Sequence, residues 1–279
     1  MDVKIYRPAS NQSFFGLIGS IIKGLADGRQ LAYRLFRRDL KASVEASLLG
    51  LTWLFIPALA AAGIWILLNQ QRVITVTPGP MIYPAYVLIG TTMWNIFAEA
   101  LNKPIQRYKA AMNMMVKLNF PREALLLASF YDMVFSVLIK LLVLLPLLMF
   151  VGLEPNWSWL LSIVISMGIV FTGLAIGIFI SPIGVLFNDI SRGINVVLPF
   201  FMFLTPVVYS IPRGSFMDKA QAFNPITPWI ELCRASMGDY PFDMHLSLLV
   251  WLLISAAVFV VGLVMMRIAL PIIVERSGT

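Results

Sequence analysis

Side chains that usually carry chemistry are scarce in this chain of 279 residues, which has one histidine, His245, and one cysteine, Cys233. A histidine-based triad or a zinc site needs several such groups, and an intrachain disulfide needs two cysteines. The phosphate-binding pattern G-x-x-x-x-G-K-[ST] does not occur in the sequence. We therefore predict that the chain is not an enzyme and binds neither a metal nor a cofactor.

Three ionisable residues lie inside or at the ends of apolar segments, and such groups are functional candidates by default. Glu99 can reach an aqueous interface, and Lys140 can extend its long side chain outward to one. Asp132 is harder to explain in this way. A proton-coupled transporter usually carries more such groups on broken helices, so three residues are too few to favour that mechanism.

The composition indicates the kind of protein in which these residues lie. Hydrophobic residues make up 59% of the chain and charged residues 13%, which is about half the usual share of charge in a soluble domain. The mean hydropathy of +0.84 predicts an integral membrane protein and excludes soluble enzymes. The net charge of +7 is typical of the cytoplasmic loops of membrane proteins, so we expect no nucleic-acid partner.

The expected fold is all-α, because backbone inside a bilayer must satisfy its own hydrogen bonds. Six segments are long and apolar enough to span a membrane. No signal peptide and no internal repeat is evident, so we predict one domain with an interface segment (residues 1–43), a membrane part (44–270) and a cytoplasmic tail (271–279). The predicted spans are Ser47–Leu68, Met81–Leu101, Ala124–Val151, Trp157–Phe187, Ile194–Ile211 and Leu246–Leu270.

Lysine and arginine residues predict the orientation of these spans. They gather in the N-terminal segment, including Lys4 and Arg7, and in the loop after the second span. The opposite side has fewer of them, for example Arg72 and Lys219. Both termini are therefore expected in the cytoplasm.

The stretch Phe14–Leu40 has apolar residues at helical spacing between basic ones, which is typical of a helix in the membrane interface. The pair Asp27-Gly28 interrupts the pattern, so we expect two short helices. Two interpretations remain open: a passive anchor that attracts anionic lipid, and an interface helix that also contacts a cytoplasmic partner.

The loop Asn102–Arg122 predicts another short helix, opened by Pro104 and closed by Pro121. Apolar residues among its charges favour a docking site for another protein over a solvated loop. The candidate docking residues are Lys103, Arg107, Tyr108, Lys109, Met112 and Lys117.

The outer segment Pro212–His245 is too polar to span and too apolar for an ordinary loop, so its part Phe216–Met237 is expected to form short re-entrant helices. Glu231 and Arg234 lie three residues apart there and could pair. Aromatic side chains suit a passage for sugars, since their faces stack on C–H groups. The candidate passage residues are Trp53, Phe200, Phe201 and Tyr209.

Several motifs, in this order and spacing, resemble permeases of the ABC-2 type, in the branch that exports O-antigens, capsules, teichoic acids and other polysaccharides. The resemblance covers most of the chain from Leu35 onward. The sequence departs from the family pattern at Glu45, Pro57 and Asn188. The motifs are Leu35–Lys41, Leu49-Gly50-x-x-Trp53 with Pro57, Asn119–Glu123, Gly184-x-x-Phe187-Asn188-Asp189-Ile190, Thr205–Ser210 and Asn224–Glu231.

The resemblance implies a bacterial inner-membrane permease in which two copies form a channel and bind two cytoplasmic ABC ATPase subunits. ATP and Mg²⁺ would be bound by those subunits and not by this chain. The Lys103–Lys117 stretch would couple to the ATPase, and a lipid-linked glycan would be the substrate. A periplasmic or outer-membrane export protein is a further possible partner. The outer gate would include Pro225, Pro228, Trp229 and Glu231.

Two other interpretations remain. The first is an ion-coupled secondary transporter or flippase of lipid-linked glycan without an ATPase, which should show coupling charges and repeats. The second is a membrane-embedded transferase, which should carry an acid–base pair facing one leaflet. Asp132 and the distant His245 do not supply such a pair.

Overall fold

The computed structural model describes residues 14–45, 48–73, 80–118, 120–211, 214–238 and 240–277. Within those residues the chain forms helices and turns and no strand. Lys4, Arg7 and Asn119, which the sequence patterns above include, lie outside the described residues. The helices, in order, are α1 (Phe14–Glu45), η1 (Gly50–Leu54), α2 (Ile56–Gln70), α3 (Tyr83–Ala110), α4 (Met112–Lys117), α5 (Glu123–Phe150), η2 (Trp157–Leu160), α6 (Leu161–Leu186), α7 (Asn188–Leu204), α8 (Phe216–Gln221), α9 (Thr227–Met237) and α10 (His245–Ser277).

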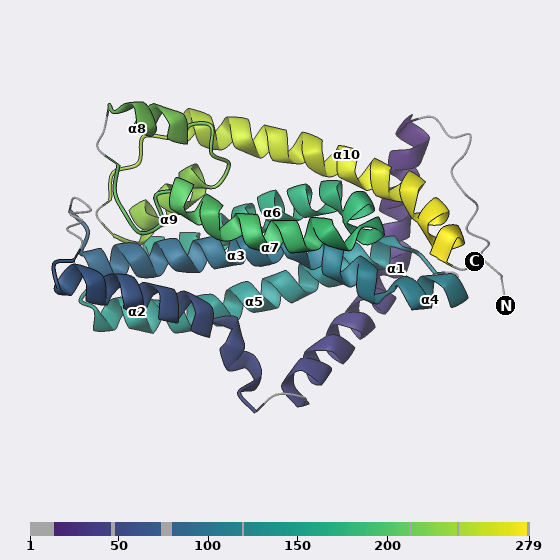
Figure 1. The fold of residues 1–279 in the computed structure, drawn as a ribbon, viewed down its shortest axis with the longest axis horizontal. Helices are drawn as coiled ribbons and strands as arrows, with labels where there is room; N and C mark the ends of the chain where they lie inside the picture. The colour runs from purple at the N-terminus through teal and green to yellow at the C-terminus, as the bar shows by residue number, and fades with distance from the viewer. Residues whose placement is uncertain are drawn as a thin grey trace.

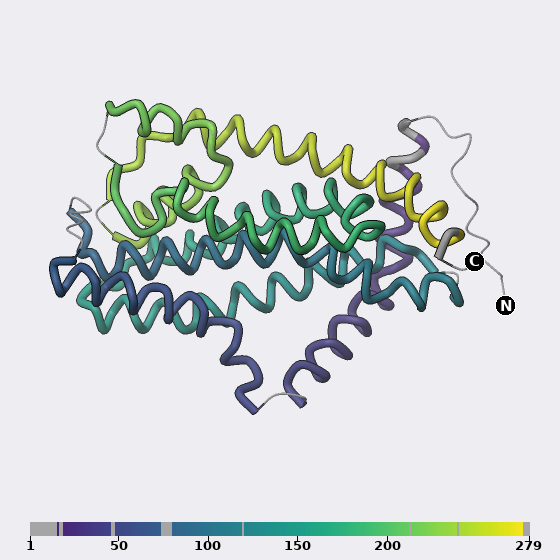
Figure 2. The backbone as a smooth tube through the Cα atoms, viewed as in Figure 1, coloured from purple at the N-terminus to yellow at the C-terminus, as the bar shows by residue number. Residues whose placement is uncertain are grey.

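Most of the long helices lie side by side along the longest axis of the molecule, as Figure 1 shows. Helix α1 instead crosses one end of this bundle, near α4 and the end of α10. Helices α8 and α9 lie at the opposite end. Figure 2 shows how the backbone passes back and forth between the two ends. We call the end with α1 and α4 the α1 end, and the other the α9 end.

Helices α3 and α6 form the centre of the bundle because glycines let their backbones approach closely. A Cβ atom added at Gly177 would lie 2.3 Å from the carbonyl oxygen of Leu101. One added at Gly173 would lie 2.7 Å from the Cβ atom of Ala100. The Gly173-x-x-x-Gly177 spacing thus brings the two helices into close contact. Most of α3 is buried by its neighbours.

Among the residues that the structure describes, three helical segments are long and apolar enough to cross a membrane: Glu123–Phe150, Trp157–Leu186 and His245–Glu275. The apolar helix Ile56–Gln70 is shorter. The first predicted span begins too early, because η1 precedes α2 and Pro57 is accommodated in the first turn of α2.

The fifth predicted span also differs from the structure. Helix α7 begins at Asn188 and ends at Leu204, since Thr205 takes an extended conformation before Pro206. Helix α10 in turn continues through Pro271 to Ser277, so the helix extends into the predicted tail.

Helix α1 is one continuous helix of 32 residues, so the prediction of two short helices is wrong. Gly28 does not break it, because this position is a contact point between helices. A Cβ atom added at Gly28 would lie 3.0 Å from the Cβ atom of Ala124 in α5. The glycine therefore allows close packing of α1 on α5 and does not end the helix.

The prediction that Pro104 opens a helix is also wrong, because Pro104 lies inside α3. The helix continues through the proline to Ala110, where packing of Ile105 and Tyr108 in the core supports it. The separate short helix is α4, which covers only Met112–Lys117.

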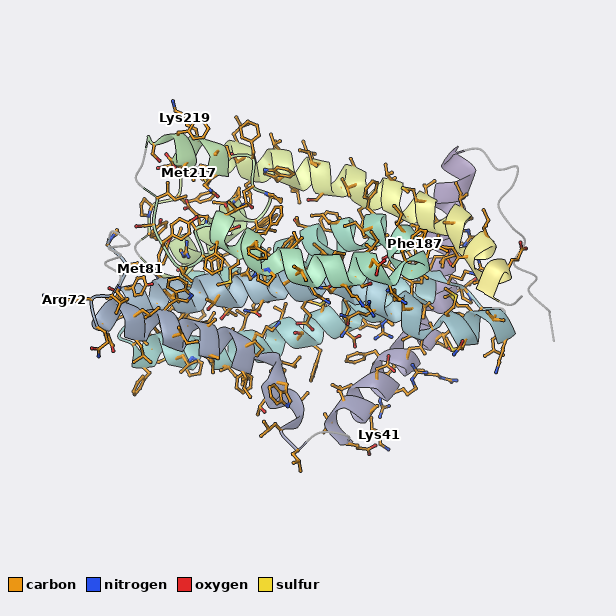
Figure 3. All side chains as sticks on the ribbon, viewed as in Figure 1. Lys41, Arg72, Met81, Phe187, Met217 and Lys219 are labelled. Atoms are coloured by element: carbon orange, nitrogen blue, oxygen red, sulfur yellow. The ribbon has the colours of Figure 1, made fainter. Side chains whose placement is uncertain are left out.

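The outer segment forms two short helices, α8 and α9, as predicted. Ser215 caps α8 by accepting a hydrogen bond from the backbone of Asp218, and Pro228 occupies the first turn of α9. Figure 3 shows Arg72, Met81 and Lys219 at the α9 end, whereas Phe187 lies toward the α1 end.

Candidate functional site

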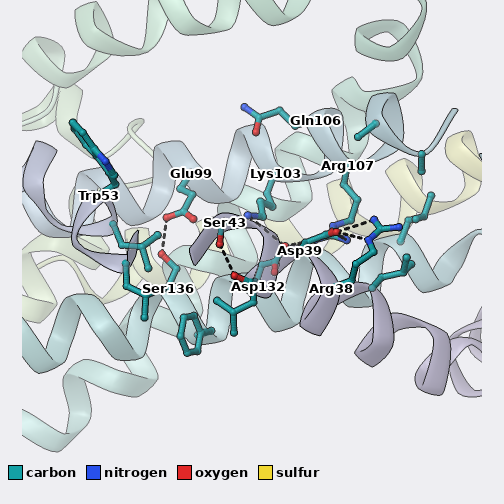
Figure 4. Close-up of a pocket in the computed structure, with 18 of the residues that line it drawn as sticks. Arg38, Asp39, Ser43, Trp53, Glu99, Lys103, Gln106, Arg107, Asp132 and Ser136 are labelled. Carbon is teal, nitrogen blue, oxygen red and sulfur yellow. Dashed lines mark hydrogen bonds and ion pairs between the residues drawn. The ribbon is translucent and has the colours of Figure 1, made fainter. Parts of the chain in front are cut away.

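Three cavities follow the length of α3. The inner cavity, of about 520 Å³, lies among α1, η1, α3 and α5 (Figure 4). The middle cavity, of about 540 Å³, lies among α2, α3 and α7. The outer cavity, of about 820 Å³, lies among α3, α6, α7 and the segment that leads to α9.

Neighbouring cavities share lining residues, so they follow one another along α3, and we call this succession of cavities the path. Glu99 and Lys103 line both the inner and the middle cavity, together with Trp53. Trp94 and Leu198 line both the middle and the outer cavity. The path therefore runs from the α1 end of the bundle toward the α9 end.

The inner cavity is lined by a network of ion pairs that joins three helices. Arg107 of α3 pairs with Asp132 of α5, and its Nη1 atom lies 2.9 Å from Oδ2 of Asp39 in α1. The Nζ atom of Lys103 lies 3.3 Å from the same Asp132 carboxylate. Arg38 donates to Asp39 over 2.8 Å. These contacts fix α1 against α3 and α5, and the Asp132 carboxylate pairs with two basic side chains of α3.

A second buried ion pair lies further along the path. The Nζ atom of Lys140 in α5 is 2.6 Å from Oε2 of Glu99 in α3, and Ser136 donates to the same oxygen over 2.7 Å. The Lys140 side chain is only 4% exposed. The prediction that Lys140 extends outward is therefore wrong, because a carboxylate on the neighbouring helix satisfies it internally.

The outer cavity has an aromatic and largely apolar lining. Its aromatic residues come from α3, from α7 and from the turns around α8. The Tyr209 hydroxyl donates to the carbonyl of Phe203 over 2.7 Å, which holds this part of the wall. The aromatic lining residues are Trp94, Phe97, Phe201, Phe203, Tyr209 and Phe223.

The four predicted passage residues do not all line the same cavity. Phe201 and Tyr209 line the outer cavity. Trp53 lines the inner and middle cavities. Phe200 lines none of these three cavities, and its side chain is 66% exposed on the free side of α7. Three of the four residues therefore share one path, although they lie at different depths.

The predicted docking residues do not share one surface. Lys103 and Arg107 face the ion-pair network, and Tyr108 is buried in the core. Lys109 donates hydrogen bonds to Asn188 and Ser191 at the start of α7. Of the six residues, only Met112 and Lys117 lie on α4, where Lys117 is exposed and Met112 half-buried.

The predicted gate residues lie in or beside α9. Pro225 lines the outer cavity, whereas Pro228 is buried in the first turn of α9. Trp229 packs on α6, where a Cβ atom at Gly168 would lie 2.2 Å from its ring. Glu231 is half-buried on the same helix.

Arg234 has backbone partners that its spacing from Glu231 did not predict. It is fully buried and donates to backbone carbonyls of Pro206, Val207 and Tyr86 over 2.9, 2.8 and 3.3 Å. Its guanidinium carbon lies 3.4 Å from the centre of the Tyr86 ring. Arg234 thus joins α9 to α3 and to the turn after α7.

A further ion pair closes the α1 end. Glu123, the first residue of α5, pairs with Arg267 of α10. A Cβ atom at Gly24 of α1 would lie 2.8 Å from the Glu123 carboxylate, so three helices meet here. Burial lowers the pKa of the neighbouring Arg122, and the Glu123 carboxylate opposes that shift.

Sequence reasoning missed several residues of the path. Asp39 appeared only as part of a motif, although its negative charge on a largely basic amphipathic stretch was a usable signal. Phe97 was not among the predicted passage residues, and Asn224 appeared only as part of a motif. Among the described residues, no group of three or more His, Cys, Asp or Glu side chains could hold a metal ion.

An all-helical bundle with apolar spans and a polar-to-aromatic internal path defines a multi-pass membrane protein of the transporter type. The sequence matches the ABC-2 type transporter family over residues 30–238. The chain belongs to this family, so the resemblance inferred from its motifs is confirmed. It is therefore a membrane permease and not the subunit that hydrolyses ATP, which in this family is a separate chain.

Two relatives illustrate the likeness. The chain is 24% identical to the O-antigen export system permease protein RfbA of Myxococcus xanthus over 212 residues, which covers 74% of this chain and 79% of the relative. It is also 24% identical to the RfbA protein of Klebsiella pneumoniae over 213 residues, covering 74% and 80% of the two chains.

Proposed function

We propose that this chain is the permease subunit of an ATP-driven exporter that moves a lipid-linked polysaccharide, such as an O-antigen or capsule glycan, out of the cytoplasm. The path along α3 is the observation that supports this proposal most strongly. Its inner part offers the partly exposed basic side chains of Arg38 and Lys103, which suit the phosphate linkage of a lipid carrier. Its outer part offers aromatic faces, which suit sugar rings.

In the proposed topology, α2, α3, α5, α6, α7 and α10 cross the inner membrane of a bacterium, with both termini in the cytoplasm. The α1 end is then cytoplasmic, and α1 lies in the inner interface. Helices α8 and α9 form a re-entrant segment in the outer leaflet, where Pro225 and Trp229 contribute to a gate. The excess of basic residues in the loops at the α1 end supports this orientation.

A second copy of the chain would complete the channel. Helix α7 has no buried residue in the single chain. Val196 and Phe200 on its free side are more than 60% exposed. An apolar face beside an internal path is expected to meet another protein surface, so two copies facing each other through α7 would enclose the path.

Helix α4 is the proposed contact with the ATPase subunit. It protrudes at the α1 end and exposes Val116 and Lys117, followed by Leu118. The hydrogen bonds of Lys109 link the preceding helix to the start of α7. A displacement of α4 would therefore be transmitted to α7, which lines the path. The ATPase can cause such a displacement only if it binds the two positions of α4 with different affinity.

Purification of the tagged chain in mild detergent from its native host tests the proposal. Mass spectrometry should find a stoichiometric ABC ATPase, and liposomes containing the complex should export the glycan only with ATP. Lys117→Glu should weaken ATPase retention and export. The matched variant Lys219→Glu, which reverses an exposed charge at the α9 end, should change neither. Transport that runs on an ion gradient with the chain alone would refute the proposal.

A further inference from the structure

A separate groove of about 770 Å³ lies between α1 and α5. It shares only one lining residue, Phe135, with the inner cavity. Each wall is one face of a helix, because its residues recur every three or four positions. The lining residues are Ala26, Arg29, Gln30, Tyr33 and Phe36 of α1, and Tyr131, Val134, Phe135 and Leu138 of α5.

Aromatic rings form the floor of this groove. The Phe36 ring centre lies 6.2 Å from that of Tyr131 and 6.0 Å from that of Phe135, in edge-to-face contacts. The Tyr33 ring contacts Tyr131 at 6.5 Å, and Tyr33 remains 52% exposed. The groove is therefore a stiff apolar surface that the single chain leaves open.

The rim of the groove is basic. Arg29 is its only charged lining residue, so no carboxylate lines it. The guanidinium of Arg37 lies 5.9 Å from the Tyr33 ring centre and adds a second cation nearby. Asp27 is two positions from Arg29, which places it about 200° away around the helix. The facing carboxylate of Asp132 on α5 is already paired with Arg107 and Lys103.

The apolar wall continues beyond the groove along α5. Leu138 is 48% exposed, and Leu142, one turn further, is 68% exposed. Both face outward on a helix that is long and apolar enough to cross a membrane. The groove thus has a cationic end beside α1 and an open apolar strip that leads into the bilayer.

We propose that this groove binds one anionic phospholipid of the adjacent leaflet. The headgroup phosphate contacts Arg29, with Arg37 adding to the local positive charge, and an acyl chain lies over Tyr131 and Leu138. A lipid matches both the charge of the rim and the continuous apolar strip, whereas a soluble phosphate ester matches only the rim. The site is distinct from the path along α3 and does not depend on which substrate that path carries.

Native mass spectrometry of the full chain, released from nanodiscs that contain phosphatidylglycerol and phosphatidylcholine, tests this site. The wild type should retain one phosphatidylglycerol per chain in preference to phosphatidylcholine. Arg29→Gln should weaken this retention about fivefold, as expected for one cation near an anionic headgroup. Arg34→Gln is the matched control, because Arg34 is exposed on the same helix and lines neither this groove nor the inner cavity.

A second variant tests the apolar part of the site. Leu138→Trp places a larger ring on a half-exposed position, so the chain should fold and retain less phosphatidylglycerol. Equal losses for Arg29→Gln and Arg34→Gln would show general surface attraction and overturn the proposal. Release of the lipid by millimolar glycerol phosphate would also overturn it, since the site would then recognise a soluble phosphate. The proposal would also be overturned if a second copy of the chain covers the groove, so that lipid never enters it.

Discussion

The buried pair of Glu99 and Lys140 leads to an asymmetric prediction. The Lys140 side chain is 4% exposed, whereas that of Glu99 is 24% exposed and lines two cavities. Glu99→Gln leaves an ammonium group without a carboxylate in the core, although the new amide oxygen can still accept one hydrogen bond. Lys140→Met leaves a carboxylate that keeps its bond from Ser136 and can contact water in the cavities.

Breaking a buried ion pair by removing one partner destabilises a protein by about 3–5 kcal/mol. We expect about 3 kcal/mol for Glu99→Gln and about 1–2 kcal/mol for Lys140→Met, because the remaining charge in the latter is partly solvated. For a chain of this size, 1 kcal/mol corresponds to about 2–4 °C in Tm. The expected decreases are thus about 6–12 °C for Glu99→Gln and about 2–8 °C for Lys140→Met.

Thermal unfolding in one detergent, followed by tryptophan fluorescence, measures these differences. The double variant Glu99→Gln/Lys140→Met removes both charges and should be more stable than Glu99→Gln alone, because neither charge is then buried without its partner. If the three variants unfold at the same temperature, or if the two single effects simply add, the ion pair does not stabilise the fold in the way we infer.

Three other predictions concern the contacts that position the path. Gly177→Ala should lower Tm by at least 5 °C, because its Cβ atom would collide with the α3 backbone, whereas Gly63→Ala, where nothing lies within 4 Å, should leave Tm unchanged or slightly higher. Arg234→Met should destabilise the fold by about 3 kcal/mol, because it leaves three carbonyls without a charged donor. Arg234→Lys should not restore stability, since lysine lacks the planar guanidinium group. Faster proteolysis of the α8–α9 segment would measure this loss of stability. Lys109→Met should reduce ATP-driven export while ATPase co-purification stays normal, because only the contact with α7 is lost; loss of co-purification would show that Lys109 itself binds the ATPase.

The sequence alone was sufficient for the membrane class, the helical fold and the family. Long apolar segments can satisfy their backbone hydrogen bonds only as helices in a bilayer, so hydropathy is informative there. The two short helices of the outer segment were also predicted, because that segment is too polar to span and too apolar for an ordinary loop.

The role of individual charges required the tertiary structure. Arg107 and Lys103 read as an exposed docking surface, yet both face carboxylates on other helices. Arg234 has an acidic neighbour three residues away but donates to carbonyls of residues far from it in sequence. Sequence spacing identifies only partners on the same helix. The partners of a buried charge can lie on a neighbouring helix, and the low dielectric inside the bundle makes those contacts strong.

The bounds of the helices were likewise only partly predictable from the sequence. Gly28 and Pro104 are local breakers, yet α1 and α3 continue through them. At Gly28 the absence of a Cβ atom allows contact with α5, and at Pro104 burial of the surrounding residues holds the helix together. Local propensity therefore determined which segments form helices, and packing between helices decided that α1 and α3 continue through a local breaker, because the free energy of burial exceeds the local preference of one residue.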